Sequence, residues 1–120
     1  MKENKLVELS MDFAVKMIKL CETITGHRSL VNQLERSATS IGANIHEANY
    51  AASKADFINK FHIALKECGE TEYWIEMLVG SNAISEQTAK ELLQECGLKS
   101  PFEEESFVDV VATVEKLLNL

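Results

Sequence analysis

The residues of this sequence best suited to chemistry are three histidines and several glutamates. A carboxylate-bridged di-iron site in a helical bundle needs Glu-x-x-His on two helices, so that both side chains project inward one turn apart. None of the histidines has a glutamate three positions before it; the residues there are Ile24, Ala43 and Asn59. The sequence therefore does not predict a di-iron site.

A zinc site is also disfavoured. His46 and Glu47 begin like the His-Glu-x-x-His motif of zinc proteases, but the second histidine would fall at Tyr50. His46 and His62 both lie off the apolar faces of their predicted helices. We therefore expect surface or interface positions for these two side chains, and no metal or other cofactor.

Three glutamates could be imagined as paired carboxylates for acid–base catalysis: Glu47, Glu67 and Glu70. No glycine-rich loop or nucleophile elbow accompanies them, and no loop is long enough to form a cleft. Hydrogen-bonded or ion-paired acids are the favoured interpretation. The sequence does not predict an enzyme or a small-molecule substrate.

Two aromatic residues, Tyr73 and Trp74, could stack on exposed bases of a nucleic acid. Glutamates surround them, however, and no basic residues are interleaved with them. The pattern favours packing, with the indole N–H of Trp74 bonded to a carboxylate.

The elements that must position these residues are helices. The chain has 120 residues but only five glycines and one proline, too few for the frequent turns of a barrel or sandwich. Apolar residues recur at three- and four-residue steps in residues 3–25, 30–50, 54–80 and 85–97, and again after residue 100. We predict one all-α domain over residues 1–120, an antiparallel up-down-up-down four-helix bundle with its last helix broken near residues 97–101.

The third helix has the clearest pattern. Ser53 and Asp56 predict a capping box at its start, and Gly80 its end. Its apolar seam alternates steps of four and three and comprises Phe57, Phe61, Ala64, Cys68, Thr71, Ile75 and Leu78.

The first helix carries more apolar surface than one core needs. One face comprises Leu6, Leu9, Phe13, Met17, Leu20 and Ile24. A second row, about 120° round the helix, comprises Val7, Met11, Ala14 and Ile18. This second row predicts a further partner for the helix.

Charge and cysteine content exclude several classes of protein. The net charge is −7, so a global attraction for nucleic acid is not expected. The three cysteines form no Cys-x-x-Cys pair, which argues against both a disulfide framework and a thiolate zinc site. Charged residues interrupt every apolar run, so we expect neither a signal peptide nor a membrane span. We expect a cytoplasmic location.

The run from Arg36 to Leu78 resembles the signature of the four-helix bundle proteins of the 23S rRNA intervening-sequence family. The segments that carry this resemblance are TSIGANI with Glu47 and Ala48, then Ser53 with DFI, then IALKE, ET and YW. Within them, the candidate interface positions are Ser40, Asn44, Glu47, Glu67, Glu70, Tyr73 and Trp74.

The resemblance implies the bundle topology and assembly into a ring, commonly a homopentamer. The family is also similar to the accessory variability protein of diversity-generating retroelements, a basic bundle that contacts nucleic acid and a reverse transcriptase. This chain departs from that pattern in its acidic second half, where residues 54–120 carry six lysines and arginines against thirteen aspartates and glutamates.

Two hypotheses of function follow. The first is a non-enzymatic, self-assembling bundle that acts as an interaction or scaffold module. The second is an RNA- or ribosome-associated factor, in which assembly gathers basic residues into a local patch. The residues of that patch are Lys2, Lys5, Lys16, Lys19, Arg28 and Arg36.

Overall fold

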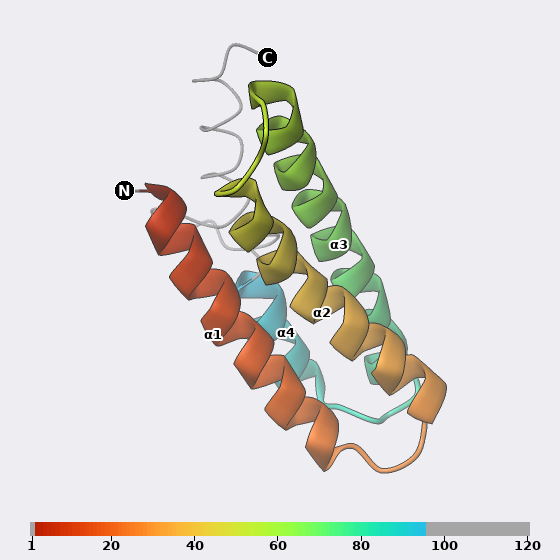
Figure 1. Cartoon of the computed structure of the whole chain (residues 1–120). Coiled ribbons are helices and arrows are strands. Elements are labelled where there is room, and N and C mark those ends of the chain that lie inside the picture. The colour runs from red at the N-terminus through yellow and green to blue at the C-terminus, as the bar shows by residue number, and fades with distance from the viewer. Residues whose placement is uncertain (1, 96–120) are drawn as a thin grey trace.

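The chain folds as an antiparallel four-helix bundle (Figure 1), as predicted. The computed structural model describes residues 2–95, with side chains described for residues 5–93. The helices are α1 (Lys2–Thr23), α2 (Arg28–Ala48), α3 (Lys54–Gly80) and α4 (Glu86–Glu95). The expected break near residues 97–101 lies outside the described residues.

The starts of α3 and α4 are fixed by serine caps. The Ser53 hydroxyl accepts a hydrogen bond from the Asp56 N–H at 3.1 Å, and the Asp56 carboxylate accepts one from the Ala52 N–H at 3.3 Å. The Ser85 hydroxyl accepts in the same way from the Thr88 N–H at 3.1 Å. Each cap satisfies a backbone donor that the first helical turn leaves unpaired, which confirms the predicted helix starts.

The connection between α1 and α2 lies two residues earlier than the sequence indicated and has the same length of four residues. α1 ends at Thr23, two residues before the expected end, and α2 begins at Arg28. Gly26 and His27 both have left-handed backbones, with φ of 81° and 52°. Glycine adopts this conformation freely, whereas histidine adopts it at a cost. Two successive left-handed residues reverse the chain within four residues.

The core lies between the predicted apolar faces. Large side chains that are at most 2% exposed come from the first three helices: Leu6, Met17, Leu34, Ile41, Ile45, Phe61, Ile75 and Leu78. α4 adds Ala89, Leu92 and Leu93, and it packs against α3. One expected core residue is an exception: Leu9 is 41% exposed because it lies at the edge of the α1 face.

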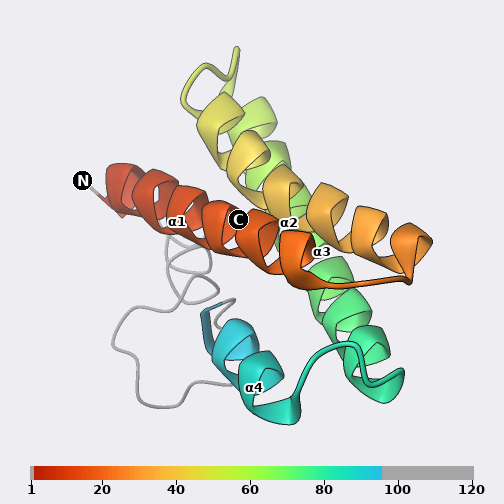
Figure 2. The same ribbon diagram turned by 90° about the horizontal axis from the view of Figure 1, so that it is seen from below.

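α2 occupies the centre of the described bundle, with α1 on one side and α3 on the other. Figure 2 shows that α1 lies beside α2 at a shallow angle, whereas α3 diverges from α2 away from the loop that joins them. None of the helices within residues 2–95 is long and apolar enough to cross a membrane.

Candidate interaction surfaces

α1 and α2 cross where both helices carry a small residue. A Cβ atom built on Gly42 of α2 would lie 3.2 Å from the Ser10 hydroxyl oxygen of α1. The buried Ser10 hydroxyl has its hydrogen-bond partner within its own helix, because it donates to the Val7 carbonyl at 3.1 Å. Larger residues at this point would hold the helices apart, so Gly42 and Ser10 set the distance between α1 and α2.

Above this contact, and lined in part by Ser10 and Gly42, the two helices leave an open apolar groove with a cavity of about 380 Å³. Its α1 wall comprises Val7, Met11, Ala14, Val15 and Ile18. Its α2 wall comprises Thr39, Gly42, Ala43 and His46. Met11 is 60% exposed, and Val15 and Ile18 are also exposed. The second apolar row predicted for the first helix is thus only partly covered by the described chain.

The cationic side chains of α1 share a polar stripe with acidic ones. Lys5, Lys16 and Lys19 are exposed, and the roughly 100° turn per residue places Glu8 and Asp12 on the same stripe. The side chain of Lys2 lies outside the described ones. This stripe carries charges of both signs, which weakens any local basic field.

α2 and α3 are joined by a buried polar contact within the apolar seam. The hydroxyl oxygens of Ser37 and Thr71 lie 3.0 Å apart, and neither residue has measurable exposure. The Ser37 hydroxyl also lies within hydrogen-bond distance of the Leu34 carbonyl, and the Thr71 hydroxyl within that of the Glu67 carbonyl. Every hydroxyl in this pair has a partner, as a buried polar group requires.

An ion-paired flank covers the outer edge of the α2–α3 contact. The Arg36 guanidinium lies 2.6 Å from the Glu70 carboxylate and 3.5 Å from that of Glu67. Further along, the Lys60 ammonium lies 3.0 Å from the Glu47 carboxylate. This hydrogen bond and the charge of Glu47 raise the pKa of Lys60 above its usual range.

Ser40 and Asn44 lie on the same edge of α2 but bond to their own helix. The Ser40 hydroxyl donates to the Arg36 carbonyl at 2.7 Å, and the Asn44 amide donates to the Ser40 carbonyl at 2.8 Å. The structure thus brings Ser40, Asn44, Glu47, Glu67 and Glu70 to one flank, where the glutamates pair with cations.

Tyr73, Trp74 and Met77 continue this flank along α3 and form what we call the aromatic ridge. The two rings pack edge to face with centroids 4.9 Å apart. Tyr73 is 53% exposed, Met77 is also exposed and Trp74 is half-buried. The hydrogen bond expected from the indole N–H to a carboxylate is not found: the buried Trp74 Nε1 and Glu67 Oε1 atoms have no partner among the described residues.

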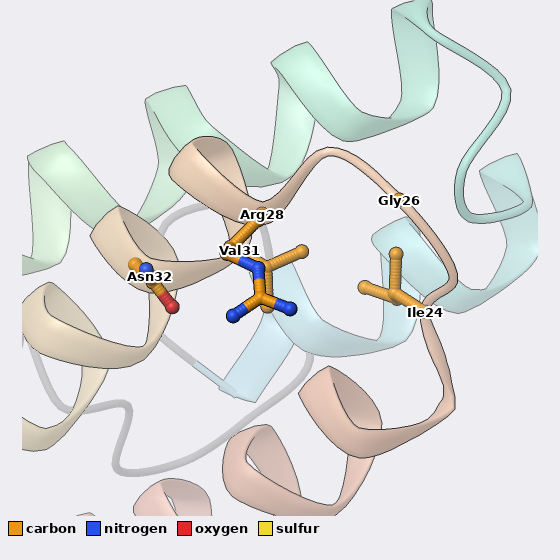
Figure 3. A pocket seen from close by; sticks show the side chains of 5 residues that line it. All are labelled: Ile24, Gly26, Arg28, Val31 and Asn32. Carbon is orange, nitrogen blue, oxygen red and sulfur yellow. The ribbon is translucent and has the colours of Figure 1, made fainter.

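A smaller hollow of about 260 Å³ lies at the start of α2 (Figure 3). It is lined by Ile24, Gly26, Arg28, Val31 and Asn32, and the Arg28 side chain reaches into the space between Asn32 and Ile24. α2 has no side-chain cap and no acidic residue in its first turn. The partial positive charge at the start of α2 and the positive charge of Arg28 therefore reinforce one another.

The remaining candidate residues are placed apart from one another. Arg36 faces α3 through its ion pairs, whereas Arg28 lies at the end of α2 near α1. His46 lines the groove and contacts the Tyr50 ring edge to face, with centroids 5.5 Å apart; His62 is exposed. Within the described part of the chain, no three His, Cys, Asp or Glu residues are grouped to hold a metal ion.

Sequence reasoning missed the Ser10–Gly42 contact, although a glycine inside a strongly periodic helix was a signal. Such a glycine costs helix stability and can mark a close packing contact, although Gly69 of α3, placed in the same way, faces open space. The partner residue could not be read from the sequence, because the crossing angle of α1 is a tertiary property.

Comparison with known proteins places this geometry in a family. A family model described as 23S rRNA-intervening sequence protein matches residues 2–100. A crystal structure of a protein of unknown function from the S23 ribosomal protein family of Bacteroides thetaiotaomicron is similar, with 33% identity and a TM-score of 0.78 over 100% of both chains. A search of curated proteins finds no match. The chain therefore belongs to the 23S rRNA-intervening sequence protein family.

Proposed function

We propose that the chain is a non-enzymatic, cytoplasmic helical bundle that assembles with copies of itself, as a homopentamer, and acts as an interaction or scaffold module. The observation that carries this proposal is the α1–α2 groove. Met11, Val15 and Ile18 expose apolar surface side by side along a cavity whose other wall is also largely apolar. Contiguous apolar surface of this kind is typical of an interaction site.

The energetics require a second contact besides the groove. Fully burying a large apolar side chain contributes roughly 1.5–3 kcal/mol, so three partly exposed side chains contribute about 3 kcal/mol together. Association costs at least about 4 kcal/mol in lost translational and rotational freedom. The aromatic ridge supplies further apolar surface of the residue types that dominate binding energy at interfaces.

Size exclusion with light scattering on the full chain tests the proposal. We expect a mass several times that of the 13.4 kDa chain at micromolar concentration, and five times that mass for a homopentamer. Val15→Glu, in the groove, should lower the mass while the helical circular dichroism stays unchanged. Asn59→Glu is a matched control at an exposed position on α3. A clean monomer from the unmodified chain would contradict self-assembly.

RNA or ribosome association is a second candidate, favoured by one observation. Arg28 lies beside an uncapped helix start, which favours a phosphate group. The other predicted cations support it less, because Arg36 is paired with two carboxylates and the α1 lysines share their stripe with acids.

Binding of a structured RNA at graded salt separates the two candidates. If RNA is bound, affinity should fall steeply with added salt, and Arg28→Ala should weaken it more than Arg36→Ala does. Absence of a mobility shift at low salt would remove this candidate and leave self-assembly unaffected.

A further inference from the structure

We infer that self-assembly is heterologous: the aromatic ridge of one copy seats in the α1–α2 groove of a second copy. This inference rests on the proposed self-assembly and names the two surfaces that meet. The ridge comprises Tyr73, Trp74 and Met77, and the groove is the cavity between α1 and α2.

The two surfaces match in chemistry. Within the described chain, the exposed large apolar residues outside α1 are Tyr50, Tyr73 and Met77. Tyr50 contacts His46 of the α2 wall and so lies beside the groove itself, whereas Tyr73 and Met77 lie one turn apart beside Trp74. The ridge is therefore the second cluster of apolar surface on the described molecule, and it has the composition of a binding hot spot.

The two surfaces also match in shape. The groove is concave, and its cavity of about 380 Å³ has room for more than one large side chain. The ridge consists of side chains that project from a single helix, and the flexible thioether of Met77 can adapt to an irregular cavity. Two grooves placed face to face would instead enclose a void, which a well-packed interface does not contain.

Charge favours the same pairing. Glu70, Glu72 and Glu76 surround the ridge, so two ridges in contact would bring like charges together. The border of the groove carries charges of both signs, with Lys19 one turn from Val15 and Glu22 one turn from Ile18. Repulsion between like charges thus disfavours a ridge-to-ridge contact, whereas the mixed charges at the border of the groove do not repel the ridge.

The positions of the surfaces give the contact its symmetry. The groove lies on the α1 side of α2, whereas the ridge belongs to α3, on the other side. A ridge-to-groove contact therefore uses different patches on the two copies and leaves each copy with one surface open. Such contacts add further copies, and they close into a ring where the rotation from copy to copy permits it.

Two variants that each destroy one surface test this pairing. Val15→Glu places a carboxylate in the groove, and Met77→Glu places one on the ridge; both positions are exposed, so the fold should tolerate the change. Each variant alone should be monomeric by light scattering. Mixed in equal amounts, they should form a dimer and nothing larger, because one intact ridge meets one intact groove.

The controls separate failure of the inference from failure of self-assembly. Asn59→Glu adds the same charge at an exposed position and should assemble like the unmodified chain. A monomeric unmodified chain would overturn self-assembly itself. An oligomeric unmodified chain whose Met77→Glu variant still assembles, or whose two folded variants do not dimerise when mixed, would overturn only the ridge-to-groove contact.

A cross-link gives a second measurement that does not depend on disruptive variants. Ala43→Cys in the groove and Tyr73→Cys on the ridge, made in separate chains and mixed under mild oxidation, should form a disulfide between the two variants. The unmodified chain, treated identically, reports dimers made by its own cysteines. Dimers of Ala43→Cys with itself, in place of mixed dimers, would contradict the inference.

Discussion

The two sides of α2 are built differently. Towards α3, α2 presents a continuous apolar seam with the Ser37–Thr71 contact inside it and ion pairs along its edge. Towards α1, it presents small residues that allow a close crossing and leave an apolar groove open. The first side is complete within one chain, whereas the second exposes surface that a partner can cover. One helix thus serves both the folding of the chain and its association.

The largest effect on stability should come from a change between α2 and α3, the side of α2 that is complete within one chain. Phe61 is 1% exposed at the centre of the α3 seam and packs on the ring of Phe57. Phe61→Ala should lower the free energy of unfolding by about 3–5 kcal/mol, through lost burial and the cavity left behind. Denaturant titration measures this, with Asn59→Ala, at an exposed position of the same helix, as control. An unchanged midpoint would mean that the seam does not hold α2 and α3 together.

The buried polar contact should contribute less. Thr71→Val keeps the side-chain volume but removes the hydroxyl that lies 3.0 Å from that of Ser37. We expect a loss of about 1–2 kcal/mol, since Ser37 keeps its bond to the Leu34 carbonyl but loses one partner. The double variant with Ser37→Ala should be less harmful than the sum of the single changes. Strict additivity would show that the two hydroxyls do not interact.

Two glycines compare the α1 crossing with an open helix surface. A Cβ at Gly69 of α3 would meet nothing within 4 Å, so Gly69→Ala should stabilise the chain by about 0.5–1 kcal/mol through helix propensity. Gly42→Ala gains the same propensity but presses on Ser10, so its gain should be smaller or reversed. Thermal unfolding of the two variants measures the difference. Equal gains would indicate a loose crossing.

The smallest effect on stability should come from the ion-paired flank. Glu70→Ala removes the nearer of the two partners of Arg36, and we expect a change of at most about 0.5 kcal/mol because the pair is partly exposed. Its effect on assembly is more informative. If Glu70→Ala or Glu67→Ala dissociates the oligomer while helicity is kept, the flank lies at a subunit contact. Unchanged mass for both variants would place the flank outside the contacts between copies.

Most of the fold could be predicted from local features. The caps at Ser53 and Ser85, the end of α3 at Gly80 and the seam around Phe61 all follow from residue type and helical period. Leu9 could not be placed correctly, because periodicity gives a direction round the helix but not how far the neighbouring helix reaches.

The surfaces could be predicted less completely. The surplus apolar row on α1 was readable from spacing, and it does line the groove. The ion-pair partners of Arg36 and Lys60 could not be predicted, because they depend on the register of α2 against α3. The indole nitrogen of Trp74 was assigned a carboxylate from composition alone, and within the described residues no such bond forms.

Cys21 provides a way to measure how often α1 separates from α2. Its thiol is buried at the end of α1, 3.9 Å from the Val31 carbonyl of α2, and burial followed by the charge of Glu35 raises its pKa to about 11. At neutral pH a thiol in this state is nearly inert, so alkylation requires α1 to lift away from α2 first. The alkylation rate of Cys21, read by peptide mass spectrometry, therefore reports how often the first helix opens. Occupation of the groove by a second copy should slow that opening.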